Sequence, residues 1–352
     1  MTVNGRYFNS SPLIIYGSTG MPLARAIHRY LSQGEGSQPA INLDFEFGKM
    51  DLSKFPNGEP DITIGSNCRD RHVYIVQSCD DRVFDALQLL IMNNAARLAS
   101  AGRVTDVIAN YPFARQDQKV RGRQPITAKL YARLLESSGA ERVITMDLHA
   151  GQEQGFFDIP CDNLEPWLLF AHDIRRRYGG FDDVAFIGPD VGAWKRIRYM
   201  MKKTDSTQIP VAVVRKERTS GSTVDVFDII GKENVAGRHA VLCDDEIDTA
   251  SSAAGALESL MRLDKPPKDA VYYATHGTFS GPANDRLAEC AERYGLKVVV
   301  TDTIPQDPQP WKEVVSAAPL LAHCLDRVQR ADSVSALFDP VQFERILYGE
   351  KP

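Results

Sequence analysis

The sequence contains no apolar run of the roughly 18 residues that a membrane-spanning helix needs, which argues against a membrane partner. A basic leader and an apolar signal core are both missing from its N-terminus, so we expect a protein that is not secreted. Its six cysteines include no Cys-x-x-Cys pair, which disfavours a zinc site or a disulfide framework and predicts reduced thiols in a cytoplasmic protein. Basic residues do not predominate. The formal net charge of -5 disfavours a nucleic-acid partner.

The length of the chain and the order of its predicted elements are those of an ordinary globular protein. A chain of 352 residues predicts two domains, at roughly 100 to 200 residues per domain. Strand-like apolar runs alternate with segments of helical spacing, and this order predicts an α/β fold. The run at residues 72–77 is similar to that at residues 239–243, and each precedes a predicted helix. Two copies of one α/β domain would explain this similarity.

Residues 239–252 have the order expected of a ligand site in such a fold. A buried strand, predicted at residues 240–243, ends at Asp244 and Asp245, and a polar loop leads to a helix from Ala253. Ligands bind outside the carboxyl ends of parallel strands. Two carboxylates can accept hydrogen bonds from ribose hydroxyls, while the loop and the helix N-terminus can wrap a phosphate. The alternative is an acidic strand end followed by an ordinary helix cap.

The most basic segment of this acidic chain is a second candidate site. Arg115, Lys119, Arg121 and Arg123 lie close together in the sequence, against the single acid Asp117. This local concentration favours a polyphosphate ligand over a plain solvated loop. A Gly-x-x-x-x-Gly-Lys phosphate loop occurs nowhere in the chain.

Two polar turns follow predicted strands. His149 comes just after a strand predicted at residues 142–146, where a neutral imidazole can bind a divalent metal or contact a phosphate. Asp190 lies in the turn at residues 189–192, after a strand predicted at residues 184–188. Both turns are predicted at the carboxyl edge of a sheet, where ligands bind.

A basic excursion separates two further predicted strands, at residues 211–214 and 224–230. It begins with residues 215–218, which include Lys216 and Arg218, and continues through the polar run 219–223. Such an excursion can close over a bound ligand as a lid. The alternative is a β-hairpin with a charged tip.

Together these stretches resemble the ribose-phosphate diphosphokinases, which make phosphoribosyl diphosphate. The resemblance runs from about Leu13 to Leu347 and keeps the family's order and spacing. Its motifs include Phe-Pro-Asn-Gly-Glu at 55–59, Ala-Arg-Gln-Asp at 114–117, Asp-Leu-His-Ala-Gly-Gln at 147–152, Pro-Asp-Val-Gly at 189–192 and the acidic loop at 244–252. The sequence departs from the family pattern at Asn67, Val120, Ala193, Trp194, Glu246, Ser251 and Ser252. A Gly in place of Ser251 would permit a backbone conformation that Ser adopts less readily.

The resemblance implies transfer of the β,γ-diphosphoryl group of Mg-ATP to the C1 hydroxyl of ribose 5-phosphate, which gives phosphoribosyl diphosphate and AMP for nucleotide biosynthesis. It assigns ATP binding to Phe55, Asn57, Glu59, Arg115, Gln116, Asp117 and His149. It assigns ribose 5-phosphate binding to Asp190, Asp244, Asp245, Asp248, Thr249, Ala250, Ser251 and Ser252. It assigns catalysis to Lys216 and Arg218, and Mg²⁺ to His149 and Asp190. Matches to a phosphate- and ADP-responsive pocket are Arg69, Arg123, Ser333, Ser335 and Phe338.

The same resemblance implies an α/β protein with two similar phosphoribosyltransferase-type domains, each a mostly parallel sheet flanked by helices. These would span residues 11–165, with the ATP-contacting loops, and 166–330, with the ribose 5-phosphate and catalytic loops. A tail at 331–352 would pack back on the first domain. A homo-oligomer, with dimers assembling to a hexamer, is also implied. A phosphoribosyltransferase and a catalytically silent regulatory subunit are the alternatives, and Ser251, Ala193 and Trp194 support the second.

Overall fold

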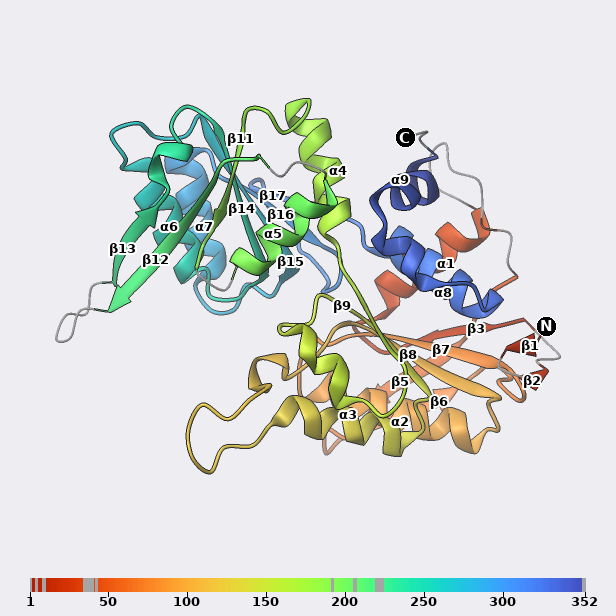
Figure 1. The fold of residues 1–352 in the computed structure, drawn as a ribbon. Helices are drawn as coiled ribbons and strands as arrows, with labels where there is room; N and C mark the ends of the chain where they lie inside the picture. The colour runs from red at the N-terminus through yellow and green to blue at the C-terminus, as the bar shows by residue number, and fades with distance from the viewer. Residues whose placement is uncertain are drawn as a thin grey trace. The chain divides into compact units, whose positions relative to one another are not determined.

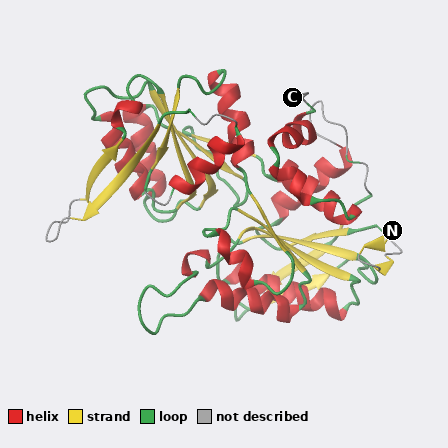
Figure 2. Ribbon diagram, viewed as in Figure 1, coloured by secondary structure: helices red, strands yellow, loops and turns green. Residues whose placement is uncertain are grey.

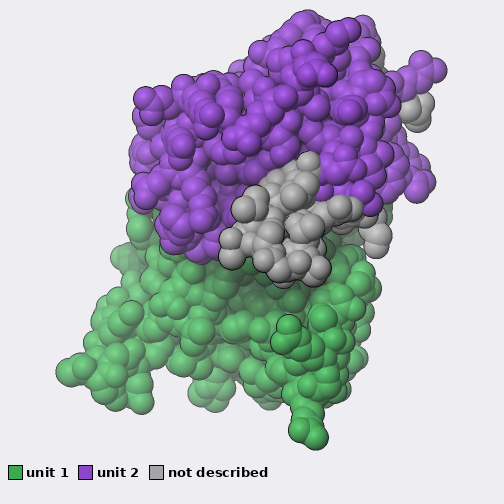
Figure 3. All heavy atoms as spheres, turned by 90° about the vertical axis from the view of Figure 1, so that its left-hand side faces the viewer, with its two compact units in different colours: residues 1–165, 303–305, 316–352 green, residues 166–302, 306–315 purple. Residues whose placement is uncertain are grey.

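The computed structural model describes residues 2–3, 6–7, 11–33, 41, 44–190, 193–204, 208–218 and 225–349. Its chain divides into two compact units, coloured separately in Figure 3, and each is described here by itself. Unit 1 comprises Met1–Glu165, Thr303–Pro305 and Ser316–Pro352, and unit 2 comprises Pro166–Asp302 and Gln306–Val315. The predicted domain end at residue 330 is therefore wrong, because residues 316–330 belong to unit 1. Residues 191–192 of the predicted turn and the polar run 219–223 lie outside the described residues.

Unit 1 is built on a six-stranded sheet in which all neighbouring strands are parallel. In spatial order its strands are β10 (Cys161–Leu164), β9 (Arg142–Met146), β8 (Arg103–Asn110), β7 (His72–Ser78), β3 (Leu13–Tyr16) and β4 (Glu46–Phe47). Every residue of β7 and β8 is buried, as expected for strands covered on both faces. Two hairpins pair outside this sheet, β1 (Thr2–Val3) with β2 (Arg6–Tyr7), and β5 (Met50–Lys54) with β6 (Pro60–Ile64).

Helices cover both faces of the unit 1 sheet (Figures 1 and 2). One face carries α2 (Phe84–Leu98) and α3 (Thr127–Ser138), and the other carries α1 (Met21–Gln33) and α8 (Ala318–Arg330). Apolar side chains of α2 and α3 form one core cluster with those of β7, β8 and β9. The short helix η4 (Val334–Phe338) and helix α9 (Pro340–Tyr348) follow α8.

Helix α8 is bonded to the sheet of unit 1 through buried polar side chains. The Oε1 atom of Gln329 accepts hydrogen bonds from His72 Nδ1 at 2.8 Å and from the Tyr74 hydroxyl at 3.0 Å. Nε2 of His72 lies 2.8 Å from Thr105 Oγ1, so the neutral ring uses both nitrogens. The C-terminal segment that packs on unit 1 thus begins with α8, earlier in the chain than the predicted tail.

Two histidines of unit 1, His72 on β7 and His323 on α8, make the protein sensitive to acid. Burial, reinforced by Arg103, lowers the pKa of His72 to about 3, and burial with Arg327 lowers the pKa of His323 to about 4. Because the unfolded chain binds these protons near pH 6.5, stability is full above that pH and is lost as pH falls toward 3. At pH 5 we expect the free energy of unfolding to fall by on the order of 2 kcal/mol per histidine.

Denaturant unfolding between pH 7 and pH 5 measures this loss. The double variant His72→Gln/His323→Gln should show a smaller change in unfolding free energy over the same range, because neither side chain can then take up a proton. An equal loss in the variant and the unaltered protein would contradict the assignment to these two rings.

Unit 2 is built on a seven-stranded sheet that is parallel except at one edge. In spatial order its strands are β13 (Asp225–Ile230), β12 (Val211–Arg218), β11 (Val184–Gly188), β14 (His239–Ile247), β15 (Asp269–Gly277), β16 (Lys297–Thr301) and β17 (Lys312–Val315). The edge strand β13 runs antiparallel to β12. The mostly parallel order places the carboxyl ends of β11, β14, β15 and β16 along one edge.

Helices also cover both faces of the unit 2 sheet (Figure 1). Side chains of α6 (Ser251–Met261) and α7 (Ala283–Tyr294) share one core cluster with the sheet, and those of α4 (Trp167–Tyr178) and α5 (Trp194–Lys203) share another. The similarity between residues 72–77 and 239–243 has a structural counterpart, because β7 and β14 are interior strands that each lead to a helix. Of the helices that are described, none combines the length and apolarity needed to cross a bilayer.

Candidate active site

The acidic residues of the predicted ligand loop lie within strand β14. We predicted that this strand ends at Asp244, but it continues to Ile247 because β15 pairs with it as far as Gly277. Asp244 and Asp245 are neighbours in this strand. Asp245 is buried, and Asp244 keeps part of its side chain exposed.

Arg196, on α5, holds the two carboxylates together. Its Nη2 atom lies 2.8 Å from Asp245 Oδ2, and its Nη1 atom lies 3.7 Å from Asp244 Oδ1. The Tyr272 hydroxyl donates to Asp244 Oδ2 at 3.2 Å. Burial and the neighbouring Asp245 carboxylate raise the pKa of Asp244 well above its usual value, and Arg196 opposes them. The pair is therefore an acidic group whose charge one arginine partly balances.

The loop after β14 leads to a helix N-terminus that has no side-chain cap. Helix α6 begins at Ser251, and the residue before it, Ala250, has a left-handed φ of 56°. Alanine is a poor capping residue, so the first backbone N–H groups of α6 can bind an anion. Thr249, Ser251 and Ser252 are exposed beside these groups. The predicted conformational conflict at Ser251 is not found, because the left-handed residue is Ala250.

The turn after β11 places Asp190 close to this acidic pair. Asp190 is exposed, and its Oδ1 atom accepts a hydrogen bond at 2.8 Å from the backbone N–H of Ala193, next to the start of α5. Its negative charge contributes to the raised pKa of Asp244, which places the two carboxylates in one electrostatic environment. Unit 2 thus gathers three predicted ribose 5-phosphate residues at the carboxyl edge of its sheet.

The predicted catalytic residues lie in a β-hairpin. Strand β12 continues through Lys216 to Arg218, beyond the predicted strand end at residue 214, because β13 pairs with it up to Arg218 opposite Asp225. The backbone at both positions is therefore extended and not part of a loop.

In unit 1, the hairpin of β5 and β6 presents the predicted adenine-contacting residues. Phe55, Asn57 and Glu59 are all exposed at its tip, and the Phe55 side chain is 47% exposed. Gly58 has a left-handed φ of 90°, and Asn57 Oδ1 accepts a hydrogen bond from the Glu59 N–H at 3.2 Å. The hydrogen bond and the left-handed glycine fix the turn, while the Phe55 ring remains available for stacking.

The basic segment of unit 1 is an exposed loop. A single 3-10 turn, Ala114–Gln116, begins it, and no further helix forms before α3. Arg115, Lys119, Arg121 and Arg123 are all exposed. The Gln116 side chain accepts a hydrogen bond from Thr127 Oγ1, so the start of the loop is fixed to α3. Asp117 is half-buried.

His149 follows the end of strand β9, whose bounds, Arg142–Met146, agree with the prediction. Its imidazole is exposed, and Asp147, which is buried, turns the chain with a left-handed φ of 46°. The short helix Gly151–Phe156 comes next, and Glu153 Oε1 accepts a hydrogen bond from the Ala150 N–H. His149 therefore lies on a structured turn at the carboxyl edge of the unit 1 sheet.

Known proteins share these features over nearly the whole chain. A model of the N-terminal domain of ribose phosphate pyrophosphokinase matches residues 13–139, and a model of a phosphoribosyl synthetase-associated domain matches residues 202–339. The ribose-phosphate pyrophosphokinase of Caulobacter vibrioides is 40% identical over 331 residues, which cover 93% of this chain and 99% of that protein. The chain belongs to the ribose-phosphate pyrophosphokinase family.

Two further comparisons agree with this family. The ribose-phosphate pyrophosphokinase of Clostridium acetobutylicum is 41% identical over 298 residues, which cover 83% of this chain and 90% of that protein. A crystal structure of phosphoribosylpyrophosphate synthetase from Mycobacterium smegmatis matches with a TM-score of 0.77 at 34% identity, covering 92% of this chain and all of that one. The predicted family, enzyme class and α/β fold class are confirmed.

The ribose-phosphate pyrophosphokinase site offers donors that fit magnesium. Among the described residues, no group of three or more His, Cys, Asp or Glu side chains is arranged to hold a metal alone. Magnesium usually keeps several waters and binds one or two carboxylates together with substrate phosphates, so such a cage is not needed. Asp190 is exposed, and a carboxylate at this position suits this role. His149 belongs to unit 1 and Asp190 to unit 2, so their pairing stays a prediction.

The predicted regulatory residues all lie in unit 1. Arg69, Arg123, Ser333 and Ser335 are exposed, and Phe338 is half-buried. Ser333 caps the short helix η4 by accepting a hydrogen bond from the Ser335 N–H, and Arg327 donates to the Ser333 carbonyl. Regulation of this pyrophosphokinase through these residues stays a prediction.

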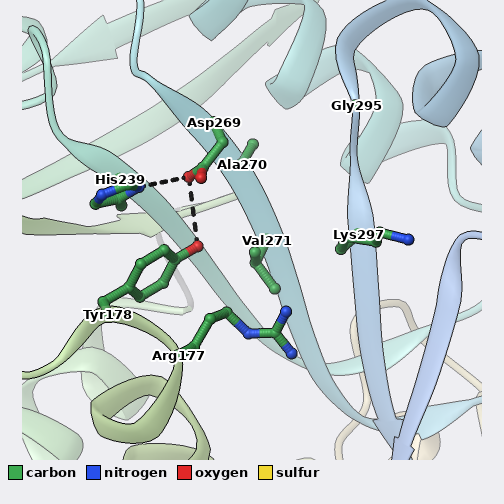
Figure 4. Close-up of a pocket in the computed structure, with 8 residues that line it drawn as sticks. All are labelled: Arg177, Tyr178, His239, Asp269, Ala270, Val271, Gly295 and Lys297. Carbon is green, nitrogen blue, oxygen red and sulfur yellow. Dashed lines mark hydrogen bonds and ion pairs between the residues drawn. The ribbon is translucent and has the colours of Figure 1, made fainter.

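A pocket of about 440 Å³ lies at the opposite edge of the unit 2 sheet (Figure 4). His239, Asp269 and Lys297, the first residues of β14, β15 and β16, line it. Asp269 Oδ1 accepts hydrogen bonds from His239 Nδ1 at 2.9 Å and from the Tyr178 hydroxyl at 3.3 Å. The pocket is at the amino edge of parallel strands, so it is separate from the sugar-phosphate loop.

Two functional contributors escaped the sequence prediction. Arg196 was assigned no role from the sequence, yet it forms the ion pairs of the acidic strand end. Tyr272 lies on β15 beside Asp244, and its register could have been inferred only from the strand pairing. Neither residue stands in a motif that points to its partner, so the local sequence carried no signal for them.

Proposed function

We propose that this ribose-phosphate pyrophosphokinase transfers the β,γ-diphosphoryl group of Mg-ATP to the C1 hydroxyl of ribose 5-phosphate, giving phosphoribosyl diphosphate and AMP. The observation that carries the proposal is the acidic strand end of β14 followed directly by the uncapped N-terminus of α6. Carboxylates that suit sugar hydroxyls and N–H groups that suit a phosphate occur there within a few residues. One sugar phosphate would satisfy both.

In this proposal the residues of unit 2 bind and orient the sugar. Asp244 and Asp245 accept hydrogen bonds from the ribose hydroxyls, with Arg196 limiting the repulsion between them. The hydroxyls of Thr249, Ser251 and Ser252, with Asp248 and Ala250 in the same loop, surround the 5-phosphate. Positive charge at the start of α6 favours a dianion at that position. The C1 hydroxyl is then held in place for attack.

The cationic side chains neutralise the charge that builds on the transferring oxygens. Arg115, Gln116 and Asp117 position the triphosphate, and Lys216 and Arg218 stabilise the transition state. The hairpin tip with Phe55, Asn57 and Glu59 holds the adenine. Magnesium, when bound near His149 and Asp190, would supply positive charge that balances the negative charge of the phosphate oxygens. No described side chain is assigned as a general base, because positioning of the hydroxyl accounts for the residues present.

We also propose that the protein acts in the cytoplasm as a homo-oligomer, with dimers assembling to a hexamer. Its free, mostly buried cysteines support a reducing compartment, because all six are unpaired with one another. The exposed Phe55 at a hairpin tip supports assembly, because an aromatic ring in that position can reach a neighbouring subunit.

The product of the reaction tests the function directly. With ATP, magnesium and ribose 5-phosphate present, we expect AMP to appear in step with phosphoribosyl diphosphate, measured by chromatography of the nucleotides. Omitting ribose 5-phosphate is the control and should abolish AMP formation. Release of ADP would contradict diphosphoryl transfer. A complete lack of turnover would favour the regulatory-subunit alternative, and consumption of phosphoribosyl diphosphate with a base would favour a phosphoribosyltransferase.

A further inference from the structure

A second segment of unit 2 holds the sugar-phosphate loop from outside. This segment, residues 277–286, runs from the last residue of β15 into the first turn of α7. The sugar-phosphate loop that it contacts is taken here as residues 246–250, from the end of β14 to the residue before α6. The carbonyl of Ile247 accepts hydrogen bonds from the N–H groups of Thr278 and Phe279, both at 3.0 Å. One carbonyl thus ties two residues of the segment to the end of β14.

A side-chain bond next to this carbonyl explains one departure from the family pattern. Glu246 replaces an apolar residue, and its Oε1 atom accepts a short hydrogen bond from the Thr278 hydroxyl. A partly buried carboxylate without a donor would cost stability, so Thr278 compensates for it. The Glu246–Thr278 pair also adds a second connection between the loop and the segment.

Arg286 makes the third connection, to a residue two positions before the start of α6. From the first turn of α7, its Nη1 atom donates to the carbonyl of Thr249 at 2.7 Å. Thr249 directly precedes Ala250, whose left-handed backbone sets the direction of the first N–H groups of α6. A guanidinium bound to this carbonyl restrains the strained turn and brings a positive charge behind it.

We propose that Arg286 is a positioning residue for ribose 5-phosphate, with the Glu246–Thr278 pair as its support. This inference rests on the proposed function of the loop and adds residues to it. Arg286 acts through Thr249, because its guanidinium holds the backbone that would bind the phosphate. Loss of this contact lets the loop leave its binding conformation, so the cost falls on sugar-phosphate affinity. The step after binding is unaffected once the site is saturated.

The substitution Arg286→Gln tests this role. We expect it to raise the KM for ribose 5-phosphate by roughly 10-fold, the scale of one hydrogen bond from a charged donor, with kcat within about 3-fold of its original value. The KM for ATP should not change. Calorimetric titration of the full chain with ribose 5-phosphate should show the same loss of affinity. Arg286→Lys keeps the charge and one donor, so it should recover part of the affinity.

Arg293→Gln is the matched control, because Arg293 is exposed in the last turn of the same helix and the substitution removes the same charge. Equal affinities of the Arg286 and Arg293 variants would overturn the inference. A failure of the proposed reaction is distinguishable, since it would appear in the unaltered protein as a lack of AMP. If Arg286→Gln does not fold, Thr278→Val should raise the same KM and Glu246→Gln, which keeps an acceptor, should not. The reverse order would overturn the role of the pair.

Discussion

Replacing Lys216 or Arg218 with alanine is expected to slow turnover by at least roughly 100-fold, the scale of one lost preorganised donor. Both residues belong to the last part of β12, so two cationic residues occur within three positions of one strand. Charge on those oxygens increases as the diphosphoryl group transfers, and a cation that meets it mainly then lowers the barrier. The KM for ribose 5-phosphate should change little, because the sugar binds at the loop after β14.

Strand β12 supplies its own control for this experiment. Arg215 lies in the same strand and is exposed, with its Nη2 atom 3.3 Å from Asp228 Oδ2. The substitution Arg215→Ala removes the same charge from the same strand, and we expect turnover within a few-fold of normal. Single-turnover rates at saturating ribose 5-phosphate separate the chemical step from binding. Near-normal rates in both the Lys216 and Arg218 variants would remove these residues from the mechanism.

Replacing Asp106 with asparagine is expected to stabilise the protein strongly at alkaline pH. Asp106 is fully buried in β8, and its Oδ2 atom accepts a hydrogen bond at 2.9 Å from Asn93 Nδ2. Within the described residues, Oδ1 of Asp106 and Oδ1 of Asn93 are both buried without a hydrogen-bond partner. Burial raises the pKa of Asp106 to about 7, and Asn93 only partly offsets this. A proton on Asp106 would turn one of the two unpartnered acceptors into a donor.

The sign of the pH dependence follows from that raised pKa. The folded protein holds the Asp106 proton more tightly than the unfolded chain, whose aspartates titrate near 3.8, so stability falls as pH rises from about 4 to 7 and is lowest above 7. A difference of about 3 pKa units corresponds to at most ~4 kcal/mol. We expect Asp106→Asn to gain on the order of 2 to 4 kcal/mol at pH 8 and less, about 1 to 2 kcal/mol, at pH 5, because pH 5 lies only slightly above the unfolded pKa.

Denaturant unfolding at pH 5 and pH 8 measures the effect. Asp158→Asn is the control, because Asp158 is exposed and the same change of charge should then alter stability by less than about 0.5 kcal/mol. A gain at Asp106 that does not depend on pH would show that the carboxylate is not the source of the cost.

Local pattern predicted those parts of the fold that depend on neighbouring residues. The apolar run before His149 gave the bounds of β9, because a buried parallel strand is a continuous hydrophobic segment. Strands β12 and β14 proved longer than predicted. Their mostly polar last residues, 215–218 and 244–247, are extended only because β13 and β15 continue beside them. Partner strands lie too far along the sequence for a local pattern to show this.

The candidate site divides in the same way. The acidic pair of β14 and the polar loop after it could be predicted, since residue types and their order point to sugar and phosphate chemistry. The contacts that hold the acidic pair and the loop in place could not be predicted. Arg196 comes from an earlier helix and Arg286 from a later one, and each meets the loop only after unit 2 has folded. The Thr278 hydroxyl that bonds to Glu246 also comes from a later part of the chain, after β15.

The order of the chain during translation differs from the order of its units. Helix α8, which covers the sheet of unit 1 with buried side chains such as Leu321 and Leu325, leaves the ribosome after the whole of unit 2. During synthesis of unit 2, one apolar face of the unit 1 sheet therefore lacks the cover of α8. Chaperone demand and vulnerability to proteases should peak in that interval.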